Sequence, residues 1–198
     1  RREIARLSLE VEDEGEFIRT VLGEISEVKG EMISLEHYYA KSCSGEIFKQ
    51  LYEAYERSLR QLNLLDFDDM LVMCHQLFME RQDILSAWQD KYRYILIDEF
   101  QDINRIQYEI VKMLALPGNN LFIVGDDDQS IYRFRGARPE IMLGFERDYP
   151  EARRLLLDTN YRSSRQIVEA AGKLIVHNRT RFEKDIKAAR GPGRPVDI

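Results

Sequence analysis

Three polar clusters in the second half of the chain contain the side chains whose types and spacing could do chemistry. The first begins with Asp98-Glu99, the second spans residues 125–137 and the third spans residues 157–164. Each cluster directly follows a short run of apolar, β-favouring residues. In open parallel sheets, ligands gather at the carboxyl ends of the strands. The three clusters are therefore the candidate site.

The pair Asp98-Glu99 ends the run YRYILI and has the residue types that nucleotide hydrolysis needs. A first carboxylate can hold Mg²⁺, which is a hard cation that prefers oxygen ligands. A second carboxylate can orient and deprotonate the water that attacks a γ-phosphate. An acidic turn after a strand is the competing interpretation, and for a bare pair of acids it is the better one. The other clusters must therefore decide between a nucleotide site and an ordinary acidic turn.

The second cluster contains three consecutive acids, Asp126–Asp128, followed by Gln129. Three adjacent carboxylates repel one another, so an ordinary turn would gain little from them. The Gln129 amide offers both a donor and an acceptor, which suits it to sense a phosphate or the attacking water. Further along, Tyr132 and Phe134 alternate with arginines, a pattern typical of a stacking and phosphate surface for single-stranded nucleic acid. A structural loop with one core aromatic is the alternative, above all for Tyr132.

In the third cluster, Tyr161-Arg162 stand at the predicted start of a helix that Ser163 or Ser164 caps. Free N–H groups at a helix start favour anions. Tyr161 would stack on a purine base, and Arg162 would reach a phosphate. A helix cap with an ion pair explains the same two residues equally well.

The elements that position these clusters follow from the hydrophobic periodicity. Residues 13–62 show helical spacing of apolar residues, and so do residues 66–78, with Asp66 as the N-cap. Three short β-favouring runs alternate with further helical stretches: Tyr92–Ile97, Leu121–Val124 and Arg154–Leu157. This alternation predicts an α/β fold, in which a parallel sheet is covered by helices on both faces.

The composition, 44% hydrophobic and 32% charged over 198 residues, is typical of a soluble, globular and rather helical protein. No stretch approaches the roughly 18 apolar residues of a membrane span, and the N-terminus has no apolar signal-peptide core. The net charge of −6 is uneven, because residues 151–198 carry +5 (11 Lys and Arg against 6 Asp and Glu) and residues 1–150 carry −11. This distribution neither favours nor excludes nucleic acid. Cys43 and Cys74 match no metal or redox spacing, so we expect free, buried thiols in a cytoplasmic protein.

Taken together and in this order, the motifs resemble those of the UvrD/Rep/PcrA type of superfamily 1 DNA helicase. DEFQD (98–102) is similar to the Walker B motif of that family, and GDDDQSIYRFRGA (125–137) is similar to its coupling motif. LDTNYRSS (157–164) is similar to the next nucleotide-contacting motif, and LDFDDM (65–70) to a further signature upstream. The resemblance implies a partial RecA-like P-loop NTPase core with a helical insertion at its N-terminal end. It also implies an enzyme that couples Mg-ATP hydrolysis to translocation on single-stranded DNA and to unwinding, 3′→5′, in DNA repair or replication.

The same resemblance assigns roles in a nucleotide site. Asp98 would bind Mg²⁺, and Glu99 would be the catalytic base. Gln129 would couple the γ-phosphate to DNA movement. Tyr161 would stack on adenine, and Arg162 would contact the γ-phosphate as an arginine finger. The implied cofactors are therefore ATP and Mg²⁺.

The resemblance also implies a DNA surface. Phe134, where the family often has tryptophan, would stack on a base of the tracking strand, with Tyr132 beside it. Arg135 would link the nucleotide and DNA sites. Phenylalanine keeps the π-face of tryptophan but has less area and no N–H donor, so a weaker grip on DNA is expected. The implied partners are single-stranded DNA, junctions of duplex and single strand, and repair or replication accessory proteins.

The phosphate-gripping loop of the family, GxxxxGK[ST], does not occur in the sequence, and the only Gly-Lys step, Gly172-Lys173, falls inside a helical pattern. We therefore expect an internal piece of a helicase. Residues 1–62 would be the remainder of subdomain 1B, residues 63–150 the second half of motor domain 1A, and residues 151–198 the start of domain 2A. We expect this piece alone neither to bind ATP tightly nor to hydrolyse it.

Other classes of protein compete with this interpretation. A metal-dependent nuclease could hold two cations between Asp98-Glu99 and Asp126–Asp128, although no lysine follows the acid pair before Lys112. A recombination-type helicase–nuclease would carry its nuclease outside these residues. A non-catalytic scaffold derived from a helicase would not need the catalytic set that this sequence keeps.

Overall fold

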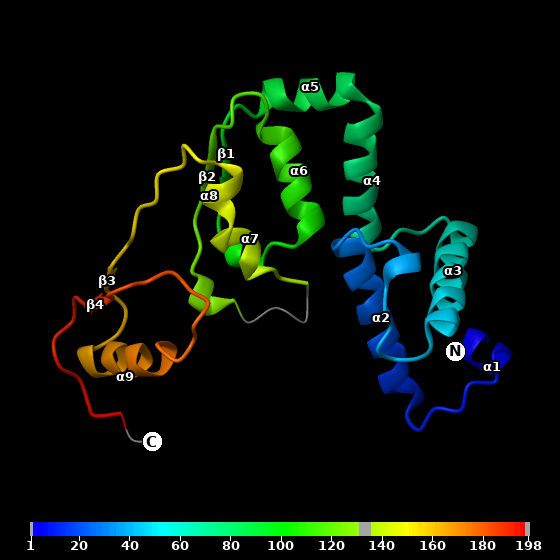
Figure 1. The fold of residues 1–198 in the computed structure, drawn as a ribbon, viewed down its shortest axis with the longest axis horizontal. Helices are drawn as coiled ribbons and strands as arrows, with labels where there is room; N and C mark the ends of the chain where they lie inside the picture. The colour runs from blue at the N-terminus through cyan, green and yellow to red at the C-terminus, as the bar shows by residue number, and fades with distance from the viewer. Residues whose placement is uncertain (1, 131–135, 197–198) are drawn as a thin grey trace.

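The computed structural model describes residues 2–130 and 136–196. Its first half contains α1 (Arg2–Arg6), α2 (Glu14–Gly30), the 3-10 turn η1 (Leu35–His37), α3 (Gly45–Leu62), α4 (Phe67–Glu80) and α5 (Gln82–Lys91). Its second half contains β1 (Ile95–Ile97), η2 (Phe100–Asp102), α6 (Arg105–Ala115), β2 (Leu121–Ile123), η3 (Asp127–Gln129), α7 (Pro139–Leu143), α8 (Phe145–Asp148), β3 (Thr159–Asn160), α9 (Arg165–Ile175) and β4 (Lys187–Ala188). Figure 1 shows three neighbouring parts: the N-terminal helices, a central part around β1, β2 and α6, and a C-terminal part around β3, β4 and α9.

The helices α2 and α3 form the N-terminal core. Asp13 caps α2 by accepting a hydrogen bond from the Glu16 N–H, and Ser44 caps α3 in the same way. Their apolar stripes pack into one buried cluster: Val21, Ile25, Val28, Phe48 and Leu51. Burial of such a stripe supplies most of the stability of helices in proteins. The predicted helical character of residues 13–62 is confirmed, with a connection around η1 between the two helices.

A buried lysine fastens α2 to the next two helices. The ammonium of Lys29, on α2, lies 2.7 Å from a carboxylate oxygen of Glu56 on α3. It lies 2.8 Å from Asp66 and 2.6 Å from Asp69 at the start of α4. Asp66 is the N-cap, as predicted, and forms a capping box with Asp69. Burial alone would raise the pKa of Asp66, but hydrogen bonds, first of all from Lys29, hold it below its ordinary value.

The strands β1 and β2 run parallel and form the central sheet, with Ile97 opposite Ile123. Both strands are shorter than predicted. Ile97 and Ile123 pack on the face that α6, α7 and α8 cover, where Phe100 is fully buried. On the other face, Leu96 and Phe122 are 72% and 55% exposed. The prediction of a sheet covered on both faces is therefore wrong for the described residues, because none of their helices packs on this second face.

The third predicted strand, Arg154–Leu157, does not form. The segment has no regular structure, and Leu155 and Leu157 are 82% and 85% exposed. Its residues favour a strand, but no described strand lies beside it to take its backbone hydrogen bonds. Instead β3 pairs with β4 just beyond it, for example through the Lys187 N–H, which donates to the Asp158 carbonyl at 2.7 Å.

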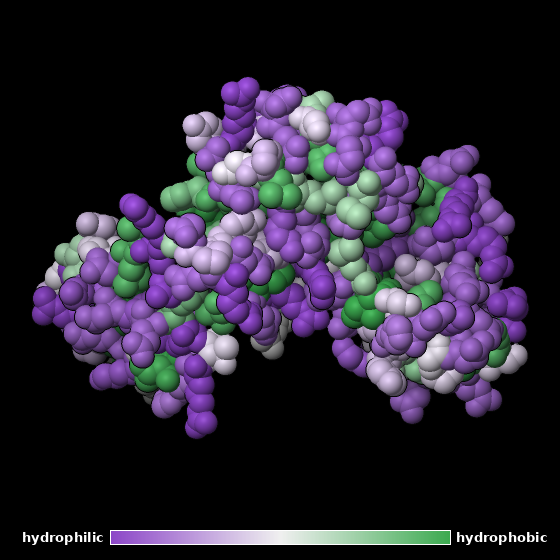
Figure 2. Space-filling model, turned by 45° about the horizontal axis from the view of Figure 1, so that its top comes forward, coloured by the Kyte–Doolittle hydropathy of each residue, from purple (hydrophilic) through white to green (hydrophobic). Residues whose placement is uncertain are grey.

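The described part of the chain is rich in helices and contains two small parallel sheets, which is compatible with the predicted α/β class. On the face shown in Figure 2, hydrophobic patches interrupt a largely hydrophilic surface. Within the described ranges, none of the helices combines the length and the apolar character that a membrane crossing requires. Cys43 and Cys74 are free, as expected, and are half-buried.

Candidate active site

Asp98 and Glu99 lie in the turn that leaves the carboxyl end of β1. Glu99 adopts the left-handed backbone conformation (φ 51°, ψ 40°), which residues other than glycine rarely adopt. Its N–H donates to Asp98 Oδ1 at 2.9 Å, and both side chains are exposed. Neither carboxylate forms an ion pair with a Lys, Arg or His of the described chain. Two adjacent carboxylates without a counter-charge attract a cation.

Gln101, which is 1% exposed, joins the ends of β1 and β2. Its Nε2 donates to Glu99 Oε2 at 2.8 Å, and its Oε1 accepts from the Asp126 N–H at 3.0 Å. A buried amide with both ends satisfied is held in one orientation. The space around it is small, because a Cβ on Gly125 would lie 2.6 Å from Gln101 Oε1. Sequence reasoning missed this residue, and its only signal was its place within the DEFQD motif.

Gln129 ends the turn η3 after β2 and is exposed. Its Nε2 donates to Asp126 Oδ2 at 2.8 Å. Since Asp126 also donates its N–H to Gln101, hydrogen bonds connect Gln129 to Glu99 through two intermediate residues. The structure therefore brings the first two predicted clusters together, as neighbouring parallel strand ends should.

The acidic triplet, Asp126–Asp128, is compensated by two cations of the chain itself. Lys184 pairs with all three carboxylates, at 3.0 Å for Asp128. Arg181 makes two hydrogen bonds to Asp128, at 2.6 and 2.8 Å. Burial alone would raise the pKa of Asp128, but hydrogen bonds from Arg181 and Lys184 hold it below its ordinary value. Oxygens of the three carboxylates lie within 4.8 Å of one another, but the Lys184 ammonium takes that position. This argues against the second cation site of a two-metal nuclease.

Tyr161 and Arg162 lie in the exposed turn between β3 and α9. Asn160 Oδ1 accepts from the N–H groups of Arg162 and Ser163, both at 2.9 Å, and shapes this turn. Ser164 takes the N-cap position of α9, but its side chain makes no capping hydrogen bond. Within the part of the chain that the structure describes, neither Tyr161 nor Arg162 is hydrogen-bonded to the first two clusters. The third cluster therefore has no direct hydrogen bond to this network within the described residues.

The three residues predicted to form a DNA surface lie outside the described residues: Tyr132, Phe134 and Arg135. The residues on either side are described. Ser130 Oγ donates to the Gln101 carbonyl at 3.3 Å, and the Arg138 N–H donates to the Ile103 carbonyl at 3.0 Å. Both flanks are therefore fixed to the chain that follows β1.

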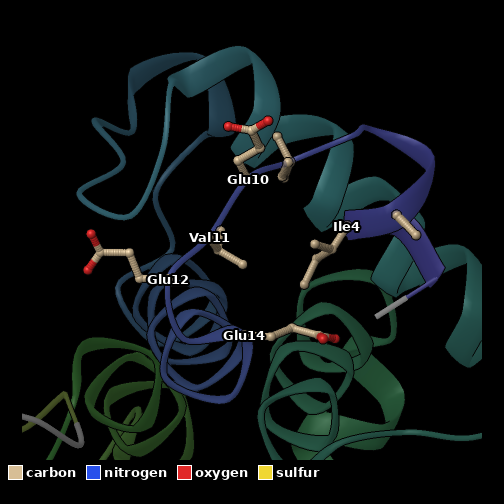
Figure 3. Close-up of a pocket in the computed structure, with 7 residues that line it drawn as sticks. Ile4, Glu10, Val11, Glu12 and Glu14 are labelled. Carbon is tan, nitrogen blue, oxygen red and sulfur yellow. The ribbon is translucent and has the colours of Figure 1, made fainter.

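A hollow of about 1000 Å³ lies elsewhere, beside α1 and the start of α2 (Figure 3). It is lined by apolar and acidic residues: Ile4, Ala5, Leu9, Glu10, Val11, Glu12 and Glu14. Phosphate groups are bound by cations and N–H donors, and none of these lining side chains is cationic. This hollow is therefore no candidate for a nucleotide site.

The motifs of the sequence agree with comparisons to known proteins. Residues 5–150 match the family model described as the UvrD/REP helicase N-terminal domain. The chain therefore belongs to the UvrD/REP helicase family, and the resemblance drawn from its motifs is confirmed.

Three relatives illustrate the similarity. The chain is 51% identical over 141 residues to the putative ATP-dependent DNA helicase YjcD of Bacillus subtilis (strain 168), covering 71% of the chain and 19% of that relative. It is 40% identical over 180 residues to the ATP-dependent DNA helicase PcrA of Leuconostoc citreum, covering 90% and 24%. It is 37% identical over 191 residues to the ATP-dependent DNA helicase Rep of Escherichia coli (strain K12), covering 95% and 28%. The chain thus spans roughly a quarter of the length of these relatives.

Proposed function

We propose that this chain is part of an ATP-dependent DNA helicase, which couples Mg-ATP hydrolysis to 3′→5′ translocation on single-stranded DNA and to unwinding. The observation that carries the proposal is the hydrogen-bonded network joining Glu99 to Gln129 across neighbouring strand ends. The three relatives, all named as ATP-dependent DNA helicases, support it. Its partners would be single strands, their junctions with duplex, and repair or replication accessory proteins.

In this proposal the chain contributes to three units. Residues 1–62 are the remainder of subdomain 1B, residues 63–150 the second half of the RecA-like domain 1A, and residues 151–198 the start of 2A. The helical N-terminal core and the two separate sheets are compatible with this division. The nucleotide would bind between the second and third units. The family's phosphate-gripping loop does not occur among these 198 residues, so we expect them alone to hydrolyse no ATP.

Asp98 has the properties that a ligand of Mg²⁺ needs. Its carboxylate is exposed, one of its oxygens accepts the Glu99 N–H, and no described cation is paired with it. When bound, Mg²⁺ would neutralise charge on the phosphate oxygens. Asp98 would supply the oxygen that keeps the ion at the end of β1.

Glu99 would act as the base. Gln101 holds its Oε2, which leaves Oε1 to orient and deprotonate the attacking water. Gln129, at the other end of the network, would sense the γ-phosphate. From the third unit, Tyr161 would stack on adenine and Arg162 would contact the γ-phosphate.

Coupling to DNA would depend on the short stretch of chain between Gln129 and Phe134. Closure around ATP would shift this stretch, and hydrolysis would release it. Phe134 and Tyr132 would stack on bases of the tracking strand, and Arg135 would connect them with the nucleotide.

The substitution Glu99→Gln in the full-length protein tests this proposal. It removes the base but keeps an amide oxygen for Gln101, so we expect hydrolysis to fall at least about 100-fold while ATP binding changes less than about threefold. Glu80→Gln makes the same chemical change at the exposed end of α4 and should alter neither. Phosphate release in the presence of single-stranded DNA measures the rate. Near-normal turnover in Glu99→Gln would remove Glu99 from the role of base.

A further inference from the structure

The segment Arg181–Lys184, here called the basic clamp, contacts the acidic triplet across a long stretch of sequence. Lys184 lies 58 positions after Asp126. The contact is buried, because the side chains of Lys184 and Asp127 are 9% and 1% exposed. The Phe182 N–H also donates to Asp127 Oδ2 at 2.8 Å, so the backbone of the clamp is held as well.

On one side, the basic clamp is connected through Asp126 to the groups proposed to act on ATP. Asp126 accepts Lys184 at Oδ1 and Gln129 at Oδ2. Lys184 and Gln129 therefore share one carboxylate. The Asp126 N–H donates to Gln101, which donates to Glu99. A displacement of Asp126 would consequently reach both ends of the network.

On its other side, the basic clamp is connected by strand pairing to the turn that carries Arg162. The strand β4 begins at Lys187, shortly after Lys184, and pairs in parallel with β3. Asn160, in β3, accepts the Arg162 N–H at 2.9 Å. Strand pairing and a side-chain hydrogen bond thus tie the Arg162 turn to the clamp.

We propose that Arg181 and Lys184 are positioning residues, which dock the turn that carries Arg162 onto the ends of β1 and β2. The inference rests on the proposed function, because it concerns the same ATP site. Without Lys184, three carboxylates within 4.8 Å of one another lose the cation that they share. A buried charge left without its partner is strongly unfavourable, so the turn η3 would open and displace Gln129. The clamp therefore sets the geometry of the site more than its affinity for ATP.

The first test uses Lys184 in the full-length protein. Lys184→Met should lower kcat for ATP hydrolysis about tenfold and change KM for ATP less than about threefold, because misplaced groups act mainly on the transition state. Lys184→Arg keeps the charge and should recover most of kcat. Lys187→Met is the matched control and should keep kcat, because Lys187 is 67% exposed and pairs with exposed Asp185 only at 3.9 Å.

A second test uses the pair of Arg181 and Asp128. Arg181→Gln and Asp128→Asn should each lower kcat. The double variant should be no slower than the slower single variant, because it leaves no unpaired partner from this pair. Additive losses would overturn the inference, and this test stands even if Lys184→Met does not fold.

Hydrogen exchange separates positioning from simple stabilisation. Backbone amides of residues 126–130 should exchange faster in Lys184→Met than in Lys187→Met. A melting temperature that falls in Lys184→Met while kcat stays at the unmodified value would overturn the positioning role. If the unmodified protein hydrolyses no ATP, the proposed function fails and the inference fails with it. If the unmodified protein is active and Lys184→Met is equally fast, the inference alone fails.

Discussion

Two groups of carboxylates lie at the ends of neighbouring parallel strands and differ in what compensates their charge. Asp98 and Glu99, after β1, are exposed and form no ion pair within the described ranges. The acidic triplet, after β2, holds Lys184 and Arg181 in largely buried contacts. Residue type does not distinguish the two groups, since both are runs of acids at strand ends. Their counter-charges distinguish them. The pair without a counter-charge is available to bind a cation, whereas the triplet, whose charge is compensated by Lys184 and Arg181, connects parts of the protein.

The largest effect is expected from a substitution in the pair without a counter-charge, Asp98-Glu99. Asp98→Asn in the full-length protein removes the charge but keeps an oxygen for the Glu99 N–H. We therefore expect ATP hydrolysis to fall at least about 100-fold, without a change in melting temperature. Asp90→Asn, the same change at an exposed position of α5, should affect neither. Phosphate release as a function of Mg²⁺ concentration measures this effect, and full activity of Asp98→Asn would show that Asp98 does not hold the cation.

An intermediate effect is expected from breaking the connection between the two groups. Gln101→Leu leaves the Asp126 N–H without its acceptor and releases Glu99. Loss of a buried hydrogen-bond partner should lower the free energy of unfolding by about 1–3 kcal/mol, and release of Glu99, the proposed base, should slow hydrolysis about tenfold. Gln76→Leu, at an exposed position of α4, is the control. Denaturant titration measures the first quantity, and an unchanged midpoint would mean that Gln101 does not hold the strand ends together.

The smallest expected effect is that of acid pH on the acidic triplet and its contact with the basic clamp. Burial tends to raise the pKa of Asp126 and Asp128. A hydrogen bond from Lys184 to Asp126, and hydrogen bonds from Arg181 and Lys184 to Asp128, hold both pKa values below the ordinary 3.8. A carboxyl group with a lowered pKa contributes stability that is fully present above its ordinary pKa and is lost as the pH falls through the lowered one. The contact between triplet and clamp should therefore persist down to a pH near 3.8 and weaken only below it.

Protection of the Phe182 amide against hydrogen exchange, followed from about pH 6 to about pH 3, measures this contact. Lys184→Met should shift the loss of protection to higher pH, because it removes a cation that lowers the pKa of Asp126 and of Asp128. Loss of protection already near pH 6 in the unmodified protein would contradict the assignment of the triplet to structure.

Much of this arrangement could be predicted because its causes are local in sequence. Capping by Asp66 and the periodicity of residues 13–62 act within a few helical turns, and the structure confirms both. The place of Asp98-Glu99 at a strand end was predictable for the same reason, since the apolar run directly precedes them.

The compensation of the acidic triplet could not be predicted, because it depends on contacts across 53 and 58 positions. The only signals were the unexplained repulsion within the triplet and the positive charge of residues 151–198. The segment Arg154–Leu157 also depends on a distant contact, because it was predicted to be a strand but has no neighbouring strand within the described residues. Its residues favour a strand, but a strand forms only where a partner is present, and residue preference does not reveal the partner.

The space around Gly125 has a genetic consequence. A Cβ there would lie 2.6 Å from Gln101 Oε1 and 3.1 Å from the Phe100 backbone nitrogen, so even alanine fits only if the buried Gln101 amide shifts and its hydrogen bonds are disturbed. Space, rather than backbone conformation, excludes a side chain at this position. An alanine allele at Gly125 would therefore encode a protein that unfolds at a lower temperature than the unmodified one, with every proposed catalytic side chain still encoded.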